Sequence, residues 1–389
     1  MCIRDRLKHT KQYIDPTHYG GFKGSSTAHY LINLVNFSLK NLDNPNIVAI
    51  MMCLIDWSKA FNRMNHNITL QRLIEYQVPE WLLKMLASYL EGRSMQVKFR
   101  GHLSLSRFLP GSSPQGTLLG LILFILTSNE TCMSFKPFPE KLIEREENLT
   151  VPEDDQEKLC RAKFVDDVTT AEAVEMNKLS LKTTERIIGP LPFRNSSDLE
   201  LSPESSLLQK EIEKAKYISD DLQMTLNSEK TKIFVINYSK NYQFTPRMRV
   251  PGSTNDLEVV FETKLVGVTL TCDLKFHKHV YNMVQSANTK LWMLRRLKQF
   301  KIKSVDLIEI YTSFIRSRLE YCVPVWNASL TEDDKVDIER IQKTAIRRIT
   351  EDNDISFEEA LKLVNLKTLE ERREELCLDF AIKCVVCTK

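Results

Sequence analysis

Residues 163–170 read KFVDDVTT, and the two adjacent carboxylates, Asp166 and Asp167, separate two short β-prone stretches. Residues 162–165 and 168–171 predict a hairpin with both acids in the tight turn at its tip. Neighbouring carboxylates repel each other. Solvent offsets that repulsion in most surface turns, whereas a divalent metal offsets it in phosphoryl-transfer sites.

A third carboxylate, Asp56, follows the apolar run NIVAIMMCLI at residues 46–55. Such a run is typical of a buried central strand, and here it ends directly at the acid. One acid at the end of a buried strand and two at a hairpin tip are the components of a split metal site of the polymerase type. On these residues alone, a bland surface turn and a metal site both stay open.

Several motifs in order then resemble the reverse transcriptase of non-LTR (LINE-like) retrotransposons. The core motifs are DWSKAF at 56–61, SPQGTLLG at 113–120 and FVDD at 164–167. Weaker matches follow the family pattern over residues 18–350, and they are GFK with ST (21–27), SYL with Arg93 (88–93), LN with KTK (226–232) and LVGV (265–268). The chain departs from the usual pattern at Lys23, Asn62 and Leu121, where the family has Arg, Asp and Pro.

The resemblance implies an α+β fold, a right-hand polymerase with a fingers remnant, a ferredoxin-like palm and a helical thumb. It also implies that the chain is a fragment, because the earlier finger motifs and the upstream endonuclease of the family are not seen. The expected division is an unmatched leader (1–17), the fingers remnant with the first half of the palm (18–135), an acidic insertion (136–160), the second half of the palm (161–270), and the thumb with C-terminal helices (271–389).

By the same resemblance, the three acids are the expected catalytic metal ligands. Asp56 and Asp166 would be shared by two Mg²⁺ ions, with Mn²⁺ as an alternative, and Asp167 would be an accessory ligand. The carbonyl group of Trp57 is a further candidate ligand.

Other motif positions predict contacts to the incoming nucleotide. Phe61 is the expected steric gate against the ribose 2′-hydroxyl, with a plain core phenylalanine as the alternative. Gln115 and Gly116 would contact the nucleotide, since glycine lets the backbone approach a ligand closely. Lys230 is the expected general acid for the pyrophosphate, and Lys232 is the rival assignment.

A basic helix is predicted after the palm, because no acid occurs from residue 274 to residue 305. Apolar residues interrupt its charges at helical spacing, which favours a thumb along a nucleic-acid backbone over a merely solvated face. The expected nucleic-acid-binding residues are Lys290, Arg295, Arg296, Lys298, Lys301 and Lys303.

Composition gives broader bounds. The chain has 389 residues, of which 42% are hydrophobic and 27% are charged. Its net charge is only +3, so total charge gives no argument for nucleic-acid binding.

Nine cysteines without a disulfide-like framework or a secretory signal predict an intracellular protein, nuclear or cytoplasmic and not secreted. The most apolar run, 118–126, is too short for a membrane span and predicts a core helix. Residues 136–158, rich in acids and proline, predict a poorly ordered, dispensable insertion.

The predicted function is an RNA-directed DNA polymerase of a non-LTR retrotransposon, with an RNA template, a DNA primer and dNTPs as partners, no membrane, and an open oligomeric state. A reverse transcriptase of the group II intron or telomerase type is a second interpretation, although DWSKAF and the LN/KTK segment argue against it. A catalytically inactive, nucleic-acid-binding remnant is the third.

Overall fold

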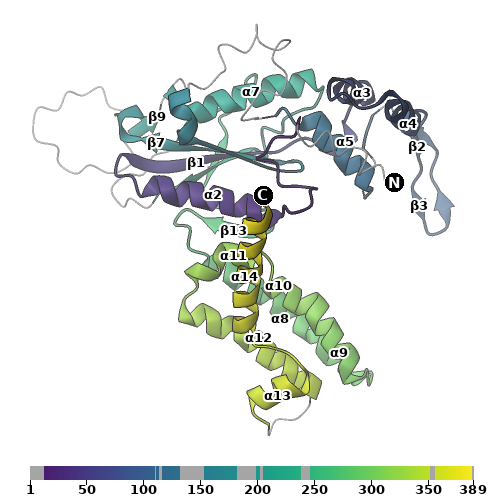
Figure 1. Cartoon of the computed structure of the whole chain (residues 1–389), viewed down its shortest axis with the longest axis vertical. Coiled ribbons are helices and arrows are strands. Elements are labelled where there is room, and N and C mark those ends of the chain that lie inside the picture. The colour runs from purple at the N-terminus through teal and green to yellow at the C-terminus, as the bar shows by residue number, and fades with distance from the viewer. Residues whose placement is uncertain are drawn as a thin grey trace, which may run out of the picture. The chain divides into compact units, whose positions relative to one another are not determined.

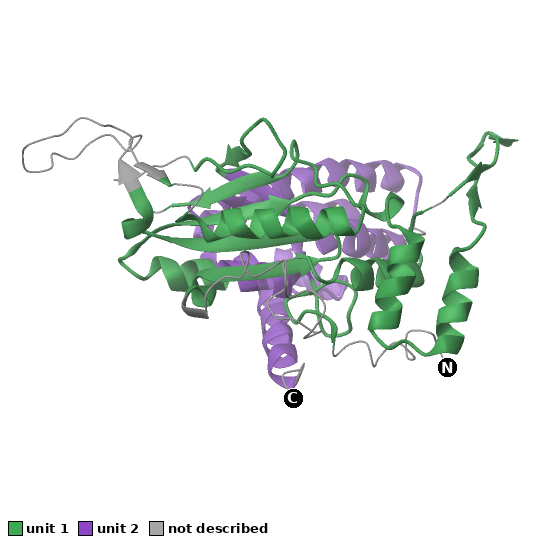
Figure 2. Ribbon diagram, turned by 90° about the horizontal axis from the view of Figure 1, so that it is seen from above, with its two compact units in different colours: residues 1–26, 36–261 green, residues 27–35, 262–389 purple. Residues whose placement is uncertain are grey.

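The computed structural model contains both helices and strands, which confirms the α+β class (Figure 1). It describes residues 13–109, 111–113, 116–131, 153–181, 199–201, 205–237, 246–350 and 355–387. Gln115, most of the leader and residues 136–152 of the acidic insertion lie outside the described residues. The chain divides into two compact units, residues 1–26 with 36–261 and residues 27–35 with 262–389 (Figure 2). Helix α2 (Thr27–Leu42) begins in the second unit and ends in the first.

The first unit is built on a five-stranded sheet in the order β11-β10-β1-β7-β6. Its strands are β1 (Ile47–Ile55), β6 (Leu159–Phe164), β7 (Asp167–Glu175), β10 (Lys232–Ile236) and β11 (Glu258–Val260). Strand β1 pairs antiparallel with both β10 and β7, and β6 with β7 form a hairpin. With helices between β1 and β6 and between β7 and β10, this is the βαββαβ topology predicted for the palm.

Strand β1 is central because its sequence is apolar on both faces, and seven of its nine residues are buried. Alternate residues Ala49, Met51 and Cys53 join the same core cluster as Ile212 and Ala215 of helix α7 (Leu207–Asp221). Side chains of a strand alternate between its faces, so this helix covers one face of the sheet. The apolar run at residues 46–55 therefore forms the predicted buried strand, which ends directly before Asp56.

Three further helices of the first unit follow β1, and they are α3 (His66–Glu75), α4 (Glu80–Leu90) and α5 (Leu118–Ser128). Helix α5 confirms the core helix predicted at 118–126. Pro79 is the N-cap of α4. Between α4 and α5 lie two short exposed hairpins, in which β2 (Ser94–Met95) pairs with β5 (Arg107–Phe108) and β3 (Lys98–Phe99) with β4 (His102–Leu103).

The described end of the acidic insertion connects to the sheet. Residues 153–158 form a 3₁₀ helix, η4 (Glu153–Lys158), and β6 already begins at Leu159, before the predicted limit at 160. The Lys158 ammonium group lies 3.1 Å from carboxylate oxygens of both Asp155 and Glu175. After β7, the 3₁₀ turn η5 (Met176–Lys178) leads to β8 (Leu179–Leu181), which pairs with β9 (Leu199–Leu201).

The second unit combines one hairpin with a set of helices. The hairpin is β12 (Glu262–Leu265) with β13 (Val268–Thr271), so the segment expected as the second half of the palm (161–270) divides between the two units. The helices are α8 (His277–Gln299), α9 (Ser304–Ile310), α10 (Ser317–Leu319), α11 (Val323–Trp326), α12 (Glu332–Thr350), α13 (Phe357–Leu363) and α14 (Leu369–Cys387). A π-helical turn, η8 (Tyr311–Arg316), joins α9 to α10. No described helix is both long and apolar enough to pass through a bilayer.

Candidate active site

The three predicted acids lie at the same end of neighbouring strands of the first unit. Asp56 follows the last residue of β1, Asp166 lies in the β6–β7 turn and Asp167 opens β7. The β1–β7 register pairs Ile55 with Val168, so its extension by one residue sets Asp56 opposite Asp167. Opposite residues of an antiparallel pair present their side chains on the same face of the sheet.

The pKa values of the two acids at the turn reflect the closeness of the three carboxylates. Desolvation by the surrounding protein, together with the charges of Asp166 and Asp56, raises the pKa of Asp167 to about 6. The pKa of Asp166 is raised as well, first by desolvation and then by Asp56. Both side chains are nevertheless partly open to solvent. Three like charges are therefore held where a cation would relieve their repulsion.

The donor chemistry of this group fits a divalent metal. Carboxylate oxygens are hard ligands, and Mg²⁺ is commonly bound by one or two carboxylates together with substrate phosphates. As their side chains lie, no three Asp, Glu, His or Cys residues in the described ranges form a group able to hold an ion.

The turn that carries Asp166 differs from the predicted one. Phe164 pairs with Asp167, so the two turn residues are Val165 and Asp166, and not the two acids. Val165 has a φ of 63°, a left-handed conformation that is a true outlier for a β-branched side chain. A Cβ atom at Gly20 would lie 2.7 Å from the backbone nitrogen of Val165, so only glycine fits beside the turn.

The backbone of Asp56 is held by hydrogen bonds to residues 226–232, the segment that contains the LN/KTK motif. The backbone N–H group of Asp56 donates to the hydroxyl group of Thr231 (3.2 Å), and the N–H group of Asn227 donates to the Asp56 carbonyl group (2.8 Å). Thr231 is buried. Lys230 lies exposed in the same turn, whereas the Lys232 ammonium group is 2.9 Å from the Glu258 carboxylate. Lys230 is therefore the more available of the two candidate lysines.

Phe61 follows Asp56 by five residues and packs against α5. It belongs to the 3₁₀ turn η2 (Ala60–Asn62), and its ring stacks on Phe124 with centroids 4.4 Å apart. The side chain is only partly buried, so part of the ring remains accessible. Gly116 is exposed with a φ of 81°, and a Cβ there would meet no atom within 4 Å. Backbone conformation, and not crowding, explains this glycine.

A buried polar network behind the hairpin was not predicted. The Lys163 ammonium group lies 2.8 Å from the Asp15 carboxylate and donates to the carbonyl oxygen of Asn129 (2.7 Å). Backbone bonds from Tyr19 to Lys163 and from Lys163 to Thr17 place this N-terminal segment along β6. Residues assigned to an unmatched leader thus cover the edge strand that carries the turn. The only signal in the sequence was a lysine at a strand position next to the acidic motif.

Comparison with known proteins identifies relatives of this chain. The chain is 33% identical over 120 residues to the probable RNA-directed DNA polymerase from transposon X-element of Drosophila melanogaster. This match covers 31% of the chain and 13% of that protein. It is 21% identical over 329 residues to the RNA-directed DNA polymerase from mobile element jockey of Drosophila funebris. This second match covers 83% of the chain and 31% of that protein.

The chain is a homologue of non-LTR transposon RNA-directed DNA polymerases.

This homologue of the transposon polymerases spans less than a third of the length of either relative. No family model matches the chain. Among solved structures, apo telomerase from Candida tropicalis aligns over 98% of this chain and 54% of its own, with 13% identity and a TM-score of 0.46. A score this low supports no conclusion about fold or function.

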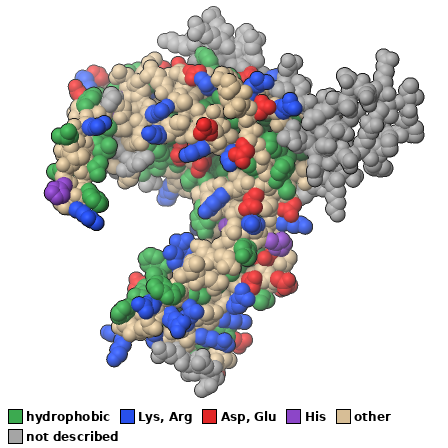
Figure 3. All heavy atoms as spheres, turned by 180° about the vertical axis from the view of Figure 1, so that it is seen from behind, with side chains coloured by type: hydrophobic (Ala, Val, Ile, Leu, Met, Phe, Trp, Pro, Cys, Tyr) green, Lys and Arg blue, Asp and Glu red, His purple; other side chains and the backbone are tan. Residues whose placement is uncertain are grey.

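In the second unit of this polymerase homologue, the predicted basic residues lie in the C-terminal half of α8 and in the residues directly after it, 300–303. Figure 3 shows Lys and Arg side chains over the helices of this unit. Exposed members are Lys290, Arg295, Arg296, Lys301 and Lys303. Lys298 differs, because it is half-buried and its ammonium group donates to the carbonyl oxygen of Ile349 (2.9 Å). Its first role is thus to bind the end of α12.

Proposed function

We propose that the chain is the catalytic part of an RNA-directed DNA polymerase of a non-LTR retrotransposon. The observation that carries this proposal is the meeting of Asp56 with Asp166 and Asp167 at one end of a βαββαβ sheet. The homology to transposon polymerases supports the same conclusion. In this proposal the first unit supplies the fingers remnant and the palm, and the second unit supplies the thumb.

The proposed cofactor is a pair of Mg²⁺ ions, which Mn²⁺ could replace. Asp56 and Asp166 would hold both ions, with Asp167 and the carbonyl group of Trp57 as further ligands. When bound, such ions supply Lewis acidity that activates a hydroxyl group and offsets charge on phosphate. The hydrogen bonds of Asp56 to Thr231 and Asn227 fix the backbone from which its carboxylate extends.

The reaction joins the primer 3′-oxygen to the α-phosphorus of a dNTP, and the bond from that phosphorus to the bridging oxygen breaks. Pyrophosphate leaves and needs a proton. Lys230 lies exposed beside Asn227, in the turn that contacts Asp56, so it is the proposed donor of that proton. The Asn227 side chain accepts from the Lys230 N–H group (3.3 Å), which fixes where this lysine leaves the backbone.

Selection of the sugar is assigned to Phe61. Its ring is held by stacking on Phe124, so it forms a rigid surface and not a mobile one. A rigid wall discriminates against a 2′-hydroxyl group by steric exclusion. Gln115 and Gly116 would contact the same nucleotide, and the left-handed backbone at Gly116 shapes that loop.

The proposed partners are an RNA template, a DNA primer and dNTPs. The proposed location is intracellular, in the nucleus or cytoplasm. The six described cysteines classed as free thiols agree with a reducing compartment.

The deciding experiment is primer extension on an RNA template with Mg²⁺, for the wild type and Asp167→Asn. We expect extension by the wild type and a loss of at least about 100-fold in the variant, because a charged ligand of the proposed metal pair is removed. Asp167→Asn should also raise the midpoint of chemical denaturation, since it relieves like-charge repulsion. Wild-type protein that binds the hybrid but extends nothing would favour the inactive remnant over the polymerase.

A further inference from the structure

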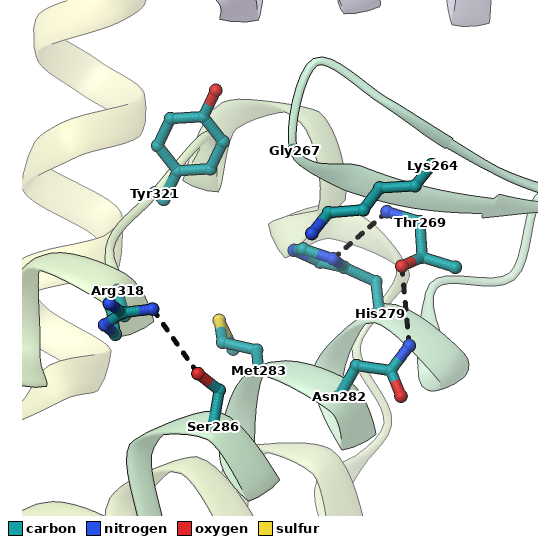
Figure 4. A pocket seen from close by; sticks show the side chains of 9 residues that line it. All are labelled: Lys264, Gly267, Thr269, His279, Asn282, Met283, Ser286, Arg318 and Tyr321. Atoms are coloured by element: carbon teal, nitrogen blue, oxygen red, sulfur yellow. Dashed lines mark hydrogen bonds between the residues drawn. The ribbon is translucent and has the colours of Figure 1, made fainter. Parts of the chain in front are cut away.

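Two features outside the acidic site differ in how their polar groups are used. The first is a pocket of about 370 Å³ in the second unit, between the β12–β13 hairpin and α8 (Figure 4). Around it, the N–H group of Thr269 donates to Nδ1 of His279 (3.3 Å), and the Tyr321 hydroxyl group donates to the carbonyl oxygen of Val266 (2.7 Å). These bonds join the hairpin to the helices that follow it, so the polar groups of the pocket serve the fold.

The second feature is an exposed β-ribbon, residues 94–108, which stands out from the rest of the first unit (Figure 1). Its tip is a two-residue turn in which Arg100 and Gly101 have positive φ angles of 48° and 84°. A type I′ turn requires positive φ at both central residues, and its twist matches that of the two strands it joins. The pairing of β3 with β4 continues directly from this turn. The ribbon is therefore a surface of defined register.

One face of the ribbon carries a line of apolar side chains. Met95, Val97 and Phe99 are 54%, 60% and 68% exposed. Alternate residues of a strand point to the same face, so the three form one row. Figure 3 shows hydrophobic side chains along this projecting part of the molecule. Contiguous apolar side chains in solvent mark surfaces that bind other proteins.

The strand with this apolar row also has an open edge. The carbonyl oxygen of Val97 accepts from the N–H group of Ser104 (2.9 Å), and the Val97 N–H group donates to the Ser104 hydroxyl group (2.9 Å). Val97 thus directs its backbone polar groups to the partner strand, and its neighbours Gln96 and Lys98 direct theirs to the outer edge. Among the described residues, no third strand pairs with the ribbon. Open N–H and C=O groups of this kind accept an added strand.

The charge of the ribbon determines which strand fits. No Asp or Glu occurs between Glu91 and Glu130. Lys98, Arg100 and Arg107 are all exposed. By strand alternation, Lys98 points to the face opposite the apolar row. A strand added at this edge would therefore set apolar side chains beside the row and acidic side chains beside Lys98.

We propose that the edge of residues 94–99 binds an extended segment of a partner protein, in which acidic and apolar residues alternate. A segment of about six residues covers this edge. A second copy of the chain is a poor occupant, because its ribbon carries the same positive charge. A nucleic-acid strand would meet the cations but would leave the apolar row uncovered. The proposal goes beyond the proposed function and does not depend on it.

The test measures binding of the full-length protein to a fluorescein-labelled peptide in which glutamate and valine alternate. Fluorescence anisotropy gives the affinity. Val97→Ser/Phe99→Ser should weaken binding at least about tenfold, because the valines of the peptide lose their apolar contacts. The matched control, Val336→Ser/Leu363→Ser, removes two apolar side chains of similar exposure from α12 and α13. It should leave the affinity within about twofold.

A charge variant and two altered peptides test the other features of the edge. Lys98→Glu/Arg100→Glu should weaken binding about tenfold or more, and a peptide with lysine in place of glutamate should not bind wild type. N-methylation of the peptide backbone removes hydrogen-bond donors but keeps the side chains, so binding should fall about tenfold. Equal binding of the methylated and unmethylated peptides would overturn strand addition. Circular dichroism checks that each variant is folded.

Three outcomes would assign the ribbon to another occupant and overturn the proposal. Single-stranded RNA that binds wild type but not Val97→Ser/Phe99→Ser would make the ribbon a nucleic-acid contact. A dimer in sedimentation that the same change dissociates would make it an interface between copies. Peptide binding that occurs only after deletion of residues 138–152 would show that the acidic insertion of this chain occupies the edge.

Absence of peptide binding by the folded wild type and by the deletion variant would also overturn the proposal. Primer extension is measured separately on the same proteins. Extension without peptide binding leaves the polymerase standing and removes the docking edge. Peptide binding that depends on Val97 and Phe99, without extension, leaves the docking edge standing and removes the polymerase.

Discussion

The carboxylate of Asp15 and the ammonium group of Lys163 lie 2.8 Å apart, with side chains that are at most 2% exposed. Burial alone would raise the pKa of Asp15, but Lys163 and Thr17 hold it below its ordinary value. Lys163 also donates to the carbonyl oxygen of Asn129. This pair joins the N-terminal segment to the strand that leads into the Val165–Asp166 turn.

Removing one member of this pair should strongly destabilise the protein. Asp15→Asn leaves an uncompensated buried charge, and we expect a loss of about 3–5 kcal/mol in the free energy of unfolding. Chemical denaturation measures it. The control is Glu80→Gln, which breaks the Glu80–Lys84 pair of the same 2.8 Å length but with both side chains exposed. That change should cost less than about 1 kcal/mol. Equal losses in the two variants would refute a special role for burial.

Gly20 should tolerate no side chain. In Gly20→Ala the added Cβ would lie 2.7 Å from the Val165 nitrogen, and backbone cannot rotate away as a side chain can. We expect a loss of about 1–3 kcal/mol in unfolding free energy, with a larger loss of primer extension because the turn holding Asp166 must shift. Gly252→Ala is the control for a loss of stability away from the turn. A Cβ there meets no atom within 4 Å, but its φ of 85° strains alanine by about 1–2 kcal/mol, so this variant should lose stability and keep wild-type extension. Wild-type extension by Gly20→Ala would show that the turn absorbs the change.

His18 should make stability depend on pH. Burial and the charge of Lys163 lower its pKa to about 4, below the ordinary 6.5. As pH falls below 6.5 the unfolded chain takes up the proton first, so stability present above pH 6.5 is lost progressively down to pH 4. The loss reaches about 3 kcal/mol by linkage. His18→Phe should flatten the profile of unfolding free energy over this window. Parallel profiles for the two proteins would contradict it.

Phe61→Val should admit ribonucleotides. The smaller side chain opens the space that the ring occupies above Phe124, so incorporation of rNTP relative to dNTP should rise about tenfold or more. Single-nucleotide extension with each substrate measures the ratio. Leu119→Val, a smaller truncation of another partly buried residue packed on the same core, is the control. If both variants keep the wild-type ratio, Phe61 is a core residue and not a gate.

The basic helix should contact phosphate through its exposed charges. Lys290→Ala/Arg295→Ala/Arg296→Ala should weaken binding to two unrelated RNA–DNA hybrids equally and flatten the salt dependence by about one unit per lost contact. Lys298→Ala should instead lower stability, because that ammonium group donates to the Ile349 carbonyl oxygen. Identical slopes for the triple variant and the wild type would remove this face from the nucleic-acid interface.

Local patterns in the sequence predicted the elements that depend on neighbouring residues. The apolar run before Asp56 gives a buried strand, and the acid pair marks the hairpin, because strand burial and turn formation are local properties. The Asp15–Lys163 pair could not be predicted, since it joins segments far apart in the chain. The left-handed Val165 was also missed, because its conformation is imposed by packing and runs against the preference of a β-branched residue.

The strand order has a consequence for how the protein is made. Strand β1 is complete at residue 55, but its two neighbours in the sheet lie at residues 167–175 and 232–236. At a ribosomal rate of about 5–20 residues per second, roughly 10–40 seconds pass before β10 has been synthesised. Until residue 175 has been made the nine apolar residues of β1 have neither strand partner, and until residue 236 they lack one of the two. Nascent chains halted before residue 232 should therefore retain chaperones that release once the second neighbour has emerged.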